Sequence, residues 1–135
     1  MSENLEFVRA IYTPWGRGDF TSADWADPTI EFEIADGPDP TKAMGLADMA
    51  RTWRGALSVW DDFRVRAREY RELDAERILV SVHNSGRAKA SGLELGELMG
   101  TSDGANLVVV RDGKVVRFVV YMDRERAFAE LDLAE

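Results

Sequence analysis

A β-hairpin near the end of the chain constrains the fold more than any other feature. Asn106–Val110 and Lys114–Tyr121 are runs rich in β-branched residues, and they flank Arg111-Asp112-Gly113. An Asp-Gly pair between two such runs is typical of a tight hairpin turn, because glycine takes a positive φ angle without a Cβ clash. Together with an aromatic-rich, helically spaced segment at the start of the chain, this hairpin predicts a small α+β protein with an apolar interior.

Three helices are predicted in the first half of the chain. The first is capped by Ser2, bends or ends at Pro14, and has an apolar stripe of Leu5, Val8, Ile11, Tyr12 and Trp15. Asp19 is placed to cap a short second helix that ends at Trp25. The third runs from Gly45 to about Trp60, and its stripe is Leu46, Met49, Trp53, Leu57 and Trp60.

The strands are predicted by their period of two. Thr29–Ile34 places Ile30, Phe32 and Ile34 on one face, and residues 36–40 form a loop. Phe63–Tyr70, Glu76–Asn84 and the hairpin then form a meander, interrupted by an irregular segment up to about Asp103. Arg64, Arg66 and Arg68 share one strand face, which we interpret as solvated or ion-paired rather than as a nucleic-acid site. A short last helix begins at Asp123.

Composition and charge limit the class of protein. The 135 residues form one domain, 1–135, with 17 basic and 25 acidic residues and a net charge of -8, which opposes binding to nucleic-acid phosphates or anionic membranes. There is no cysteine, no apolar run near the roughly 20 residues of a membrane span, and no signal-peptide pattern. We therefore expect a cytoplasmic protein. With a single histidine it should hold no closed zinc site, and we expect no cofactor.

Several short motifs together resemble the SnoaL-like branch of the NTF2-like superfamily. They are Tyr12-x-x-Trp15-x-x-Gly18-Asp19, Trp25-Ala-Asp-Pro28, Gly45 opening the Trp53-bearing helix, Arg111-Asp-Gly-Lys-Val115 and Tyr121-Met-Asp-Arg-Glu-Arg-Ala127. The resemblance covers nearly the whole chain. It implies a cone-shaped α+β barrel, in which N-terminal helices pack on a curved, mainly antiparallel sheet and enclose an apolar pocket. It also implies a homodimer, but it does not select one reaction, because the superfamily includes both enzymes and non-enzymes.

The resemblance can be tested against the acid/base groups of ketosteroid isomerase. That enzyme uses an aspartate base, with a tyrosine and a protonated aspartate as hydrogen-bond donors. The base corresponds to Phe32, the tyrosine to Ile11 with Tyr12 one position away, and the protonated carboxyl to Asn106. A phenyl ring cannot abstract a proton, so we expect no appreciable isomerisation of a 3-oxo-Δ5 steroid.

The candidate site residues are polar groups set among apolar ones, as when Asn106 alternates with Val108 and Val110 on a strand. Tyr12, Asn106 and Tyr121 would polarise a ligand oxygen, and Asp27 or Asp123 would move a proton. The ligand would be a small hydrophobic or aromatic carbonyl compound, which suits flat aromatic walls. We expect the wall to be formed by Trp15, Trp25, Phe32, Trp53, Val82, Val108 and Val119, with Phe32, Val82, Asn106, Val108, Val119 and Tyr121 on one set of strand faces.

Asp123 and the only histidine each have a structural interpretation as well. Asp123 precedes a plausible first helical turn, and a capping aspartate stabilises a helix by about 1 kcal/mol with no catalytic role. His83 shares a strand face with Leu79 and Ser81, opposite the expected pocket wall, so we expect it on the convex face. Both structural interpretations are preferred.

Two functions remain open: an enzyme acting on the carbonyl compound, and a non-catalytic NTF2-like binding or structural module. A buried carboxylate on the cavity wall would favour the enzyme. For the assembly, the sheet face opposite the pocket is expected to carry Leu79, Phe118, Val120 and Met122 without a covering helix, a large apolar patch for a monomer. We therefore predict a homodimer through this face, which Val120→Asp would disrupt.

Overall fold

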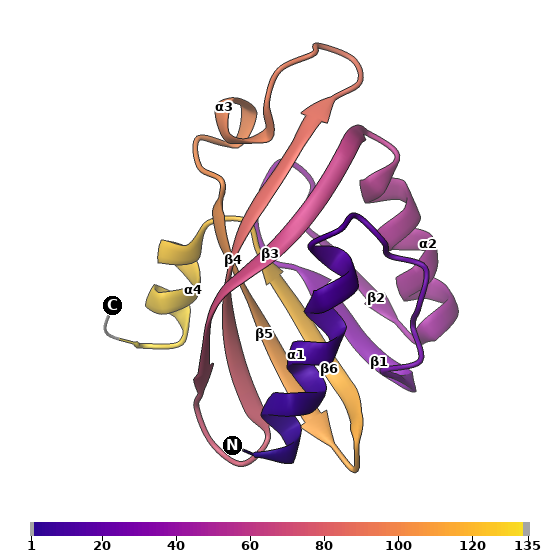
Figure 1. Ribbon diagram of the computed structural model, residues 1–135, viewed down its shortest axis with the longest axis vertical. Coiled ribbons are helices and arrows are strands. Elements are labelled where there is room, and N and C mark those ends of the chain that lie inside the picture. Colours follow the sequence, from indigo (N-terminus) through magenta and orange to yellow (C-terminus); the bar gives the residue numbers. More distant parts are fainter. Residues whose placement is uncertain (1, 134–135) are drawn as a thin grey trace.

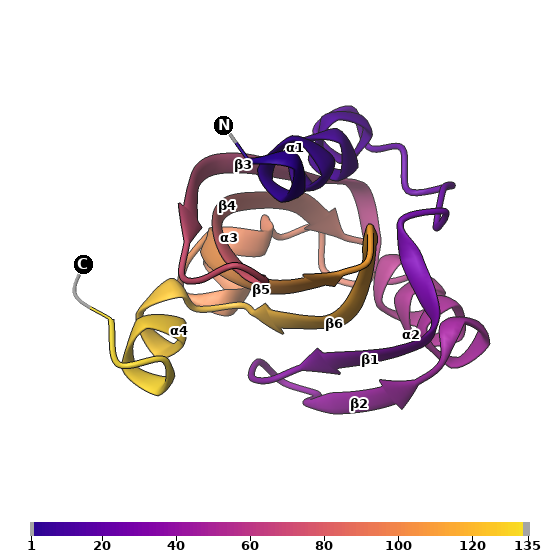
Figure 2. The same ribbon diagram turned by 90° about the horizontal axis from the view of Figure 1, so that it is seen from below.

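A computed structural model describes residues 2–133, in which six strands form one curved sheet with helices on both faces (Figures 1 and 2). The strand order is β2-β1-β6-β5-β4-β3, and every neighbouring pair is antiparallel except β1 with β6. The sheet is open, since β2 and β3 each have one neighbour. The elements are α1 (Glu3–Trp15), β1 (Ala26–Ile34), β2 (Thr41–Met44), α2 (Leu46–Leu57), β3 (Trp60–Glu72), β4 (Arg77–Ala88), α3 (Leu95–Met99), β5 (Asp103–Arg111), β6 (Lys114–Tyr121) and α4 (Arg124–Glu130).

The concave face of the sheet holds the larger core. α1 contributes Val8, Ile11 and Trp15 to it and α2 contributes Met49, which confirms the two amphipathic helices. The second helix is shorter than predicted, because it ends at Leu57 and Trp60 begins β3. The sheet contributes a continuous set of buried residues: Ile30, Phe32, Val65, Ile78, Val80, Val82, Val108, Val110, Val115 and Phe118. The predicted α+β architecture, helices on a curved and mainly antiparallel sheet, is therefore confirmed.

The final hairpin forms at the predicted place but contains an extra residue. Asp112 and Gly113 both have positive φ angles, 52° and 74°, as a tight two-residue hairpin turn requires. Val110 pairs with Val115, whereas Val109 pairs with Arg117, so Val116 is a bulge in β6. An extra residue moves every later side chain of the strand to the opposite face. Asn106 therefore pairs with Val120, and Val108 with Phe118.

This bulge overturns the expected common face of the pocket residues. Val119 and Tyr121 lie on the convex face, with Leu79 and Leu107, and not on the face of Asn106. In the same way Phe118 and Val120, expected on the outer side, pack in the concave core. The predicted alignment of Asn106 with Val119 and Tyr121 is wrong for this reason.

The convex face is covered by α4, although the prediction of a dimer assumed that no helix covers it. α4 packs Ala127 and Phe128 against the convex cluster, followed by Leu131 and Leu133 (Figure 2). The uncovered apolar patch is therefore absent from the part of the chain that the structure describes, and Val120→Asp would not probe it. The homodimer stays a prediction that rests on the resemblance alone.

Three local features differ from the expected elements. Residues 19–25 do not form a helix, because the Asp19 carboxylate accepts hydrogen bonds from the Thr21 amide and hydroxyl, which favours a turn. The short strand β2 adds to the edge of the sheet beyond β1, and α3 lies within the segment expected to be irregular.

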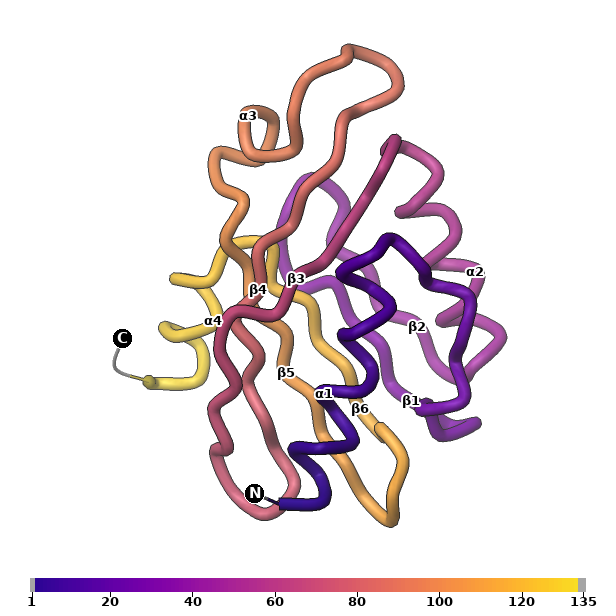
Figure 3. Tube along the Cα trace, viewed as in Figure 1, coloured from indigo at the N-terminus to yellow at the C-terminus, as the bar shows by residue number. Residues whose placement is uncertain are grey.

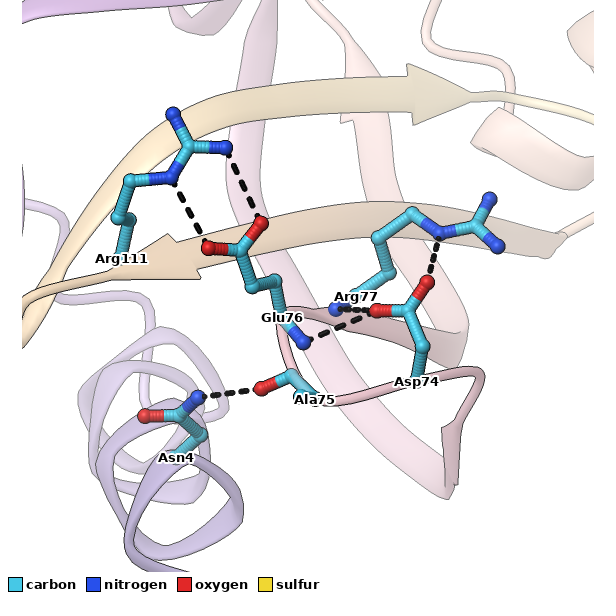
Figure 4. Close-up of polar contacts among 6 residues, drawn as sticks. All are labelled: Asn4, Asp74, Ala75, Glu76, Arg77 and Arg111. Carbon is cyan, nitrogen blue, oxygen red and sulfur yellow. Dashed lines mark hydrogen bonds and ion pairs between the residues drawn. The ribbon is translucent and has the colours of Figure 1, made fainter.

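Polar contacts fasten the narrow end of the molecule, where the N-terminal end of α1 lies beside the β3–β4 turn (Figure 3). Asn4 Nδ2 donates to the Ala75 carbonyl at 3.0 Å, and Arg111 binds both carboxylate oxygens of Glu76 at 3.0 and 3.1 Å (Figure 4). Asp74 accepts from the Arg77 side chain and from the backbone amides of Glu76 and Arg77. These contacts lower the pKa of Asp74 to about 2, with the Arg77 guanidinium as the largest cause.

We expect Asp74→Ala to lower the melting temperature at neutral pH, because the turn loses the acceptor of these hydrogen bonds. The pKa of Asp74 lies below its unfolded value of about 3.9, so this stabilisation is complete above pH 4 and lost as the pH falls towards 2. Melting curves of the two proteins should therefore converge between pH 4 and pH 2. A constant difference over that range would contradict the assignment.

Candidate functional site

A small cavity of about 80 Å³ lies between α2 and the concave face of the sheet, and we call it the inner cavity. Its walls are almost entirely apolar and aromatic, and its two polar residues are Asn84 and Asn106. The lining residues are Ile34, Trp53, Ala56, Leu57, Trp60, Phe63, Val65, Asn84, Asn106, Val120 and Met122.

Asn106 is held by a buried tyrosine behind it. Asn106 is 4% exposed, and its Nδ2 donates to the hydroxyl oxygen of Tyr12 at 2.7 Å. Burial raises the pKa of Tyr12 above its usual value, which the hydrogen bond from Asn106 opposes only in part. Tyr12 is therefore neutral at physiological pH. The Asn106 carbonyl oxygen has no hydrogen-bond partner among residues 2–133.

Asn84 is the second polar group of the inner cavity. It is 5% exposed, lies opposite Val65 on the neighbouring strand, and its side chain makes no hydrogen bond within the described residues. The space for this amide depends on Gly104, because a Cβ atom there would lie 2.9 Å from Asn84 Nδ2 and 2.7 Å from the Tyr121 carbonyl oxygen. The free polar atoms of Asn84 are not sealed off from the cavity, because Arg124 Nε is the one fully buried side-chain nitrogen or oxygen without a partner among the described residues. Water or a ligand in the inner cavity can therefore reach this amide.

The inner cavity has no ionisable wall. Of the described residues that line it, none is Asp, Glu, His, Lys or Arg. Among the described residues the one buried carboxylate is Asp36, which lines a wider neighbouring cavity of about 610 Å³, here called the entrance cavity. The two cavities share Ile34, Ala56, Trp60 and Met122. Asp36 accepts from the backbone amides of Met122 and Asp123 at 2.6 and 3.2 Å. These bonds fix the corner between β6 and α4.

The structure brings only some of the predicted site residues together. Asn106 and Trp53 line the inner cavity, and Tyr12 lies directly behind Asn106. Phe32 packs against Trp53 with ring centroids 5.6 Å apart, but it belongs to the solid core rather than to the cavity wall. Val82 and Val108 belong to the same core. Trp15 and Trp25 pack against each other and line, together with Trp53, a separate cavity of about 340 Å³.

The predicted carboxylates and Tyr121 do not reach the inner cavity. Asp27 is half-buried at the start of β1, where it accepts from the Thr29 amide and hydroxyl. Asp123 accepts from the Glu125 amide at 3.0 Å, so its expected role as the cap of α4 is confirmed. Tyr121 lies on the convex face, where burial, followed by the contact with Glu130, raises its pKa to about 12.

His83 lies on the convex side, as expected from the alternation of β4. Its Nδ1 is 3.5 Å from an Asp103 carboxylate oxygen, and both side chains are partly open to solvent. No three His, Cys, Asp or Glu side chains between residues 2 and 133 are grouped so that they could hold a metal ion. None of the helices in that part of the chain is long and apolar enough to cross a membrane.

Five residues at the two cavities were not predicted as site residues: Asn84, Trp60, Phe63, Met122 and Asp36. A signal existed for Asn84, which shares a strand face with Ile78, Val80 and Val82 and is the one polar residue in that alternating set. Phe63 likewise alternates with Arg64 and shares a strand period with Val65, which also lines the cavity. Trp60, Met122 and Asp36 lie at or beyond the ends of strands, where the period of a strand gives no information about orientation.

Comparison with solved structures places this arrangement among known folds. An NTF2-like protein of unknown function from Burkholderia pseudomallei matches with a TM-score of 0.76 at 20% identity, over 96% of this chain and 97% of that chain. TerC, co-crystallised with polyporic acid, matches with a TM-score of 0.73 at 23% identity, over 96% and 98%. A protein from Mesorhizobium loti named for the SnoaL-like polyketide cyclases matches with a TM-score of 0.68 at 16% identity, over 90% and 99%.

The chain has the NTF2-like fold. The resemblance to SnoaL-like and ketosteroid isomerase-like proteins is thereby confirmed for the fold. No protein-family model matches the sequence, and no curated protein matches it either. In this NTF2-like chain, the site must therefore be interpreted from its own side chains.

Proposed function

We propose that the protein binds a small, uncharged and mainly apolar molecule in the inner cavity, with Asn84 and Asn106 as its hydrogen-bonding partners. The observation that carries this proposal is the pair of buried amides with unused hydrogen-bonding groups on an otherwise apolar wall. A ligand carbonyl or hydroxyl group would satisfy them. TerC, which shares the fold, was co-crystallised with polyporic acid, and this supports a small-molecule site.

The absence of ionisable groups from the described wall of the inner cavity argues for an uncharged ligand. A carboxylate or ammonium group that enters an apolar cavity loses its hydration, and this costs several kcal/mol unless an opposite charge compensates. Neutral carbonyl compounds avoid that cost.

Isothermal titration calorimetry with two ligands tests this proposal. They are 2-pentanone and butanoate, which has a similar shape but carries a charge. We expect 2-pentanone to bind and butanoate not to bind. Asn84→Leu should weaken 2-pentanone binding by roughly two- to tenfold, since it removes one hydrogen bond to the ligand. Asn4→Leu, the same change at the narrow end of the molecule, is the matched control and should leave binding unchanged. Equal binding of both ligands, or an Asn84→Leu protein with normal affinity, would contradict the proposal.

A second candidate function is acid/base turnover of the bound carbonyl compound, and the position of Asp36 favours it. Each carboxylate oxygen of Asp36 accepts one backbone amide, which leaves further lone pairs for a ligand proton in the entrance cavity. If Asp36 is the base, the protein in D₂O should accelerate exchange of the α-protons of 2-pentanone, followed by NMR. Asp36→Asn should abolish the acceleration while 2-pentanone still binds. Exchange at the rate of buffer alone would leave simple binding as the function.

A further inference from the structure

An apolar groove of about 720 Å³ lies outside the inner cavity, and we call it the outer groove. It is bounded by the loop before β3, the end of β4, and α3, which lie at the same end of the molecule in Figure 1. Its apolar walls include Val59, Trp60, Leu98 and Met99. No predicted site residue belongs to it.

The outer groove and the inner cavity both share walls with the entrance cavity. Trp60 lines the inner cavity, the entrance cavity and the outer groove. Met122 is shared by the inner and entrance cavities, and Val59 and Met99 by the entrance cavity and the groove. Among their lining residues, Trp60 is the one that the inner cavity and the outer groove have in common, so it stands between the two.

The groove also exposes large apolar side chains to solvent. Val59 is 52% exposed and Leu98 is 45% exposed, and both line the groove. Scattered exposed apolar residues are common, but a contiguous apolar surface beside a cavity is typical of a binding site. The inner cavity, at about 80 Å³, is far below the 300 to 1,000 Å³ or so of ordinary ligand pockets.

We propose that the ligand is an elongated molecule, with a neutral hydrogen-bonding group at Asn84 and Asn106 and an apolar tail that passes Trp60 and occupies the outer groove. This inference rests on the proposed function and specifies its ligand class. A medium-chain ketone, alcohol or similar uncharged compound has this shape. A protein segment is a poorer occupant, because a backbone in the groove would leave the inner cavity and its two amides unfilled.

The length dependence of binding tests the proposal. In calorimetric titrations with a series from 2-butanone to 2-undecanone, we expect affinity to rise by roughly threefold to fourfold for each added methylene well beyond 2-pentanone, as apolar burial predicts. Leu98→Ser should flatten the rise for the longer ketones and leave 2-pentanone binding unchanged. Leu93→Ser is the matched control, since Leu93 is 42% exposed but does not line the groove, and it should behave as wild type.

The two proposals have different outcomes in this series. Affinity that stops rising at 2-pentanone would overturn the outer groove as part of the site and leave the inner cavity as proposed. Failure of every ketone to bind would overturn both. A Leu98→Ser protein that binds long ketones normally but has a smaller mass in sedimentation velocity would show that the groove is instead covered by a second copy of the chain.

Discussion

Replacing Asn106 by aspartate is expected to make the stability of the protein strongly dependent on pH. The two side chains are nearly the same size, so the protonated form should fit beside Tyr12. The described wall of the inner cavity offers no cation, and burial disfavours the carboxylate, which raises the pKa of a buried aspartate by up to about 3 to 5 units. A raised pKa gives full stability below about pH 3.9 and a loss that grows as the pH rises.

For a shift of about three units, the free energy of unfolding should fall by about 4 kcal/mol between pH 4 and pH 8. Urea denaturation at each pH measures this loss. Asn106→Leu is the control, because it removes the hydrogen bond to Tyr12 but adds no titratable group. Its free energy of unfolding should therefore stay below that of the wild type by an amount that does not depend on pH in this way. If the stability of the Asn106→Asp protein did not depend on pH, water would reach this side chain freely.

Phe118→Ala is expected to be the most destabilising truncation in the core. Phe118 is 0% exposed and lies within an aromatic cluster, with ring centroids 5.8 Å from Trp15, 5.7 Å from Trp25 and 6.1 Å from Phe32. Removing a buried phenyl ring loses transfer free energy and leaves a cavity, together about 3 to 5 kcal/mol. This is a large share of the total stability of a domain, about 5 to 15 kcal/mol.

The urea midpoint of Phe118→Ala checks this expectation. Phe128→Ala is the matched control, since Phe128 lies on α4 and is only partly buried against the convex face. Phe128→Ala should lose roughly half or less of the free energy of unfolding that Phe118→Ala loses, because its side chain buries a smaller apolar area. If the two variants were equally stable, Phe118 would not lie in the core, and the bulge in β6 would be assigned wrongly.

The hairpin illustrates how far the sequence could predict this fold. Asp112-Gly113 and the flanking β-branched runs located both strands, because turn chemistry is local. The bulge at Val116 could not be predicted, since nothing in a run of five residues such as Lys114–Phe118 shows which one is unpaired. That single residue decided which side chains share the face of Asn106.

The candidate site was predictable only in part for the same reason. Tyr12 and Asn106 were identified as polar residues on apolar faces, and they do meet, although they are far apart in the sequence. Trp60 was predicted as the last residue of a helix and Met122 as an outward-facing strand residue, because both patterns were extended past the points where the helix and the strand end. Their positions depend on how β3 begins after α2 and how the chain turns from β6 into α4, and no local sequence pattern encodes this packing.

Strand β3 has a consequence for how copies of this chain behave towards one another. It is an edge strand of 13 residues with a neighbour only on the β4 side, so its other side is a potential template for another chain. Arg66 and Arg68 are exposed along it, and Arg64 is ion-paired with Asp62. Charged side chains on an edge strand oppose the addition of a foreign strand. The arginine stripe thus protects the longest strand of the sheet against intermolecular aggregation.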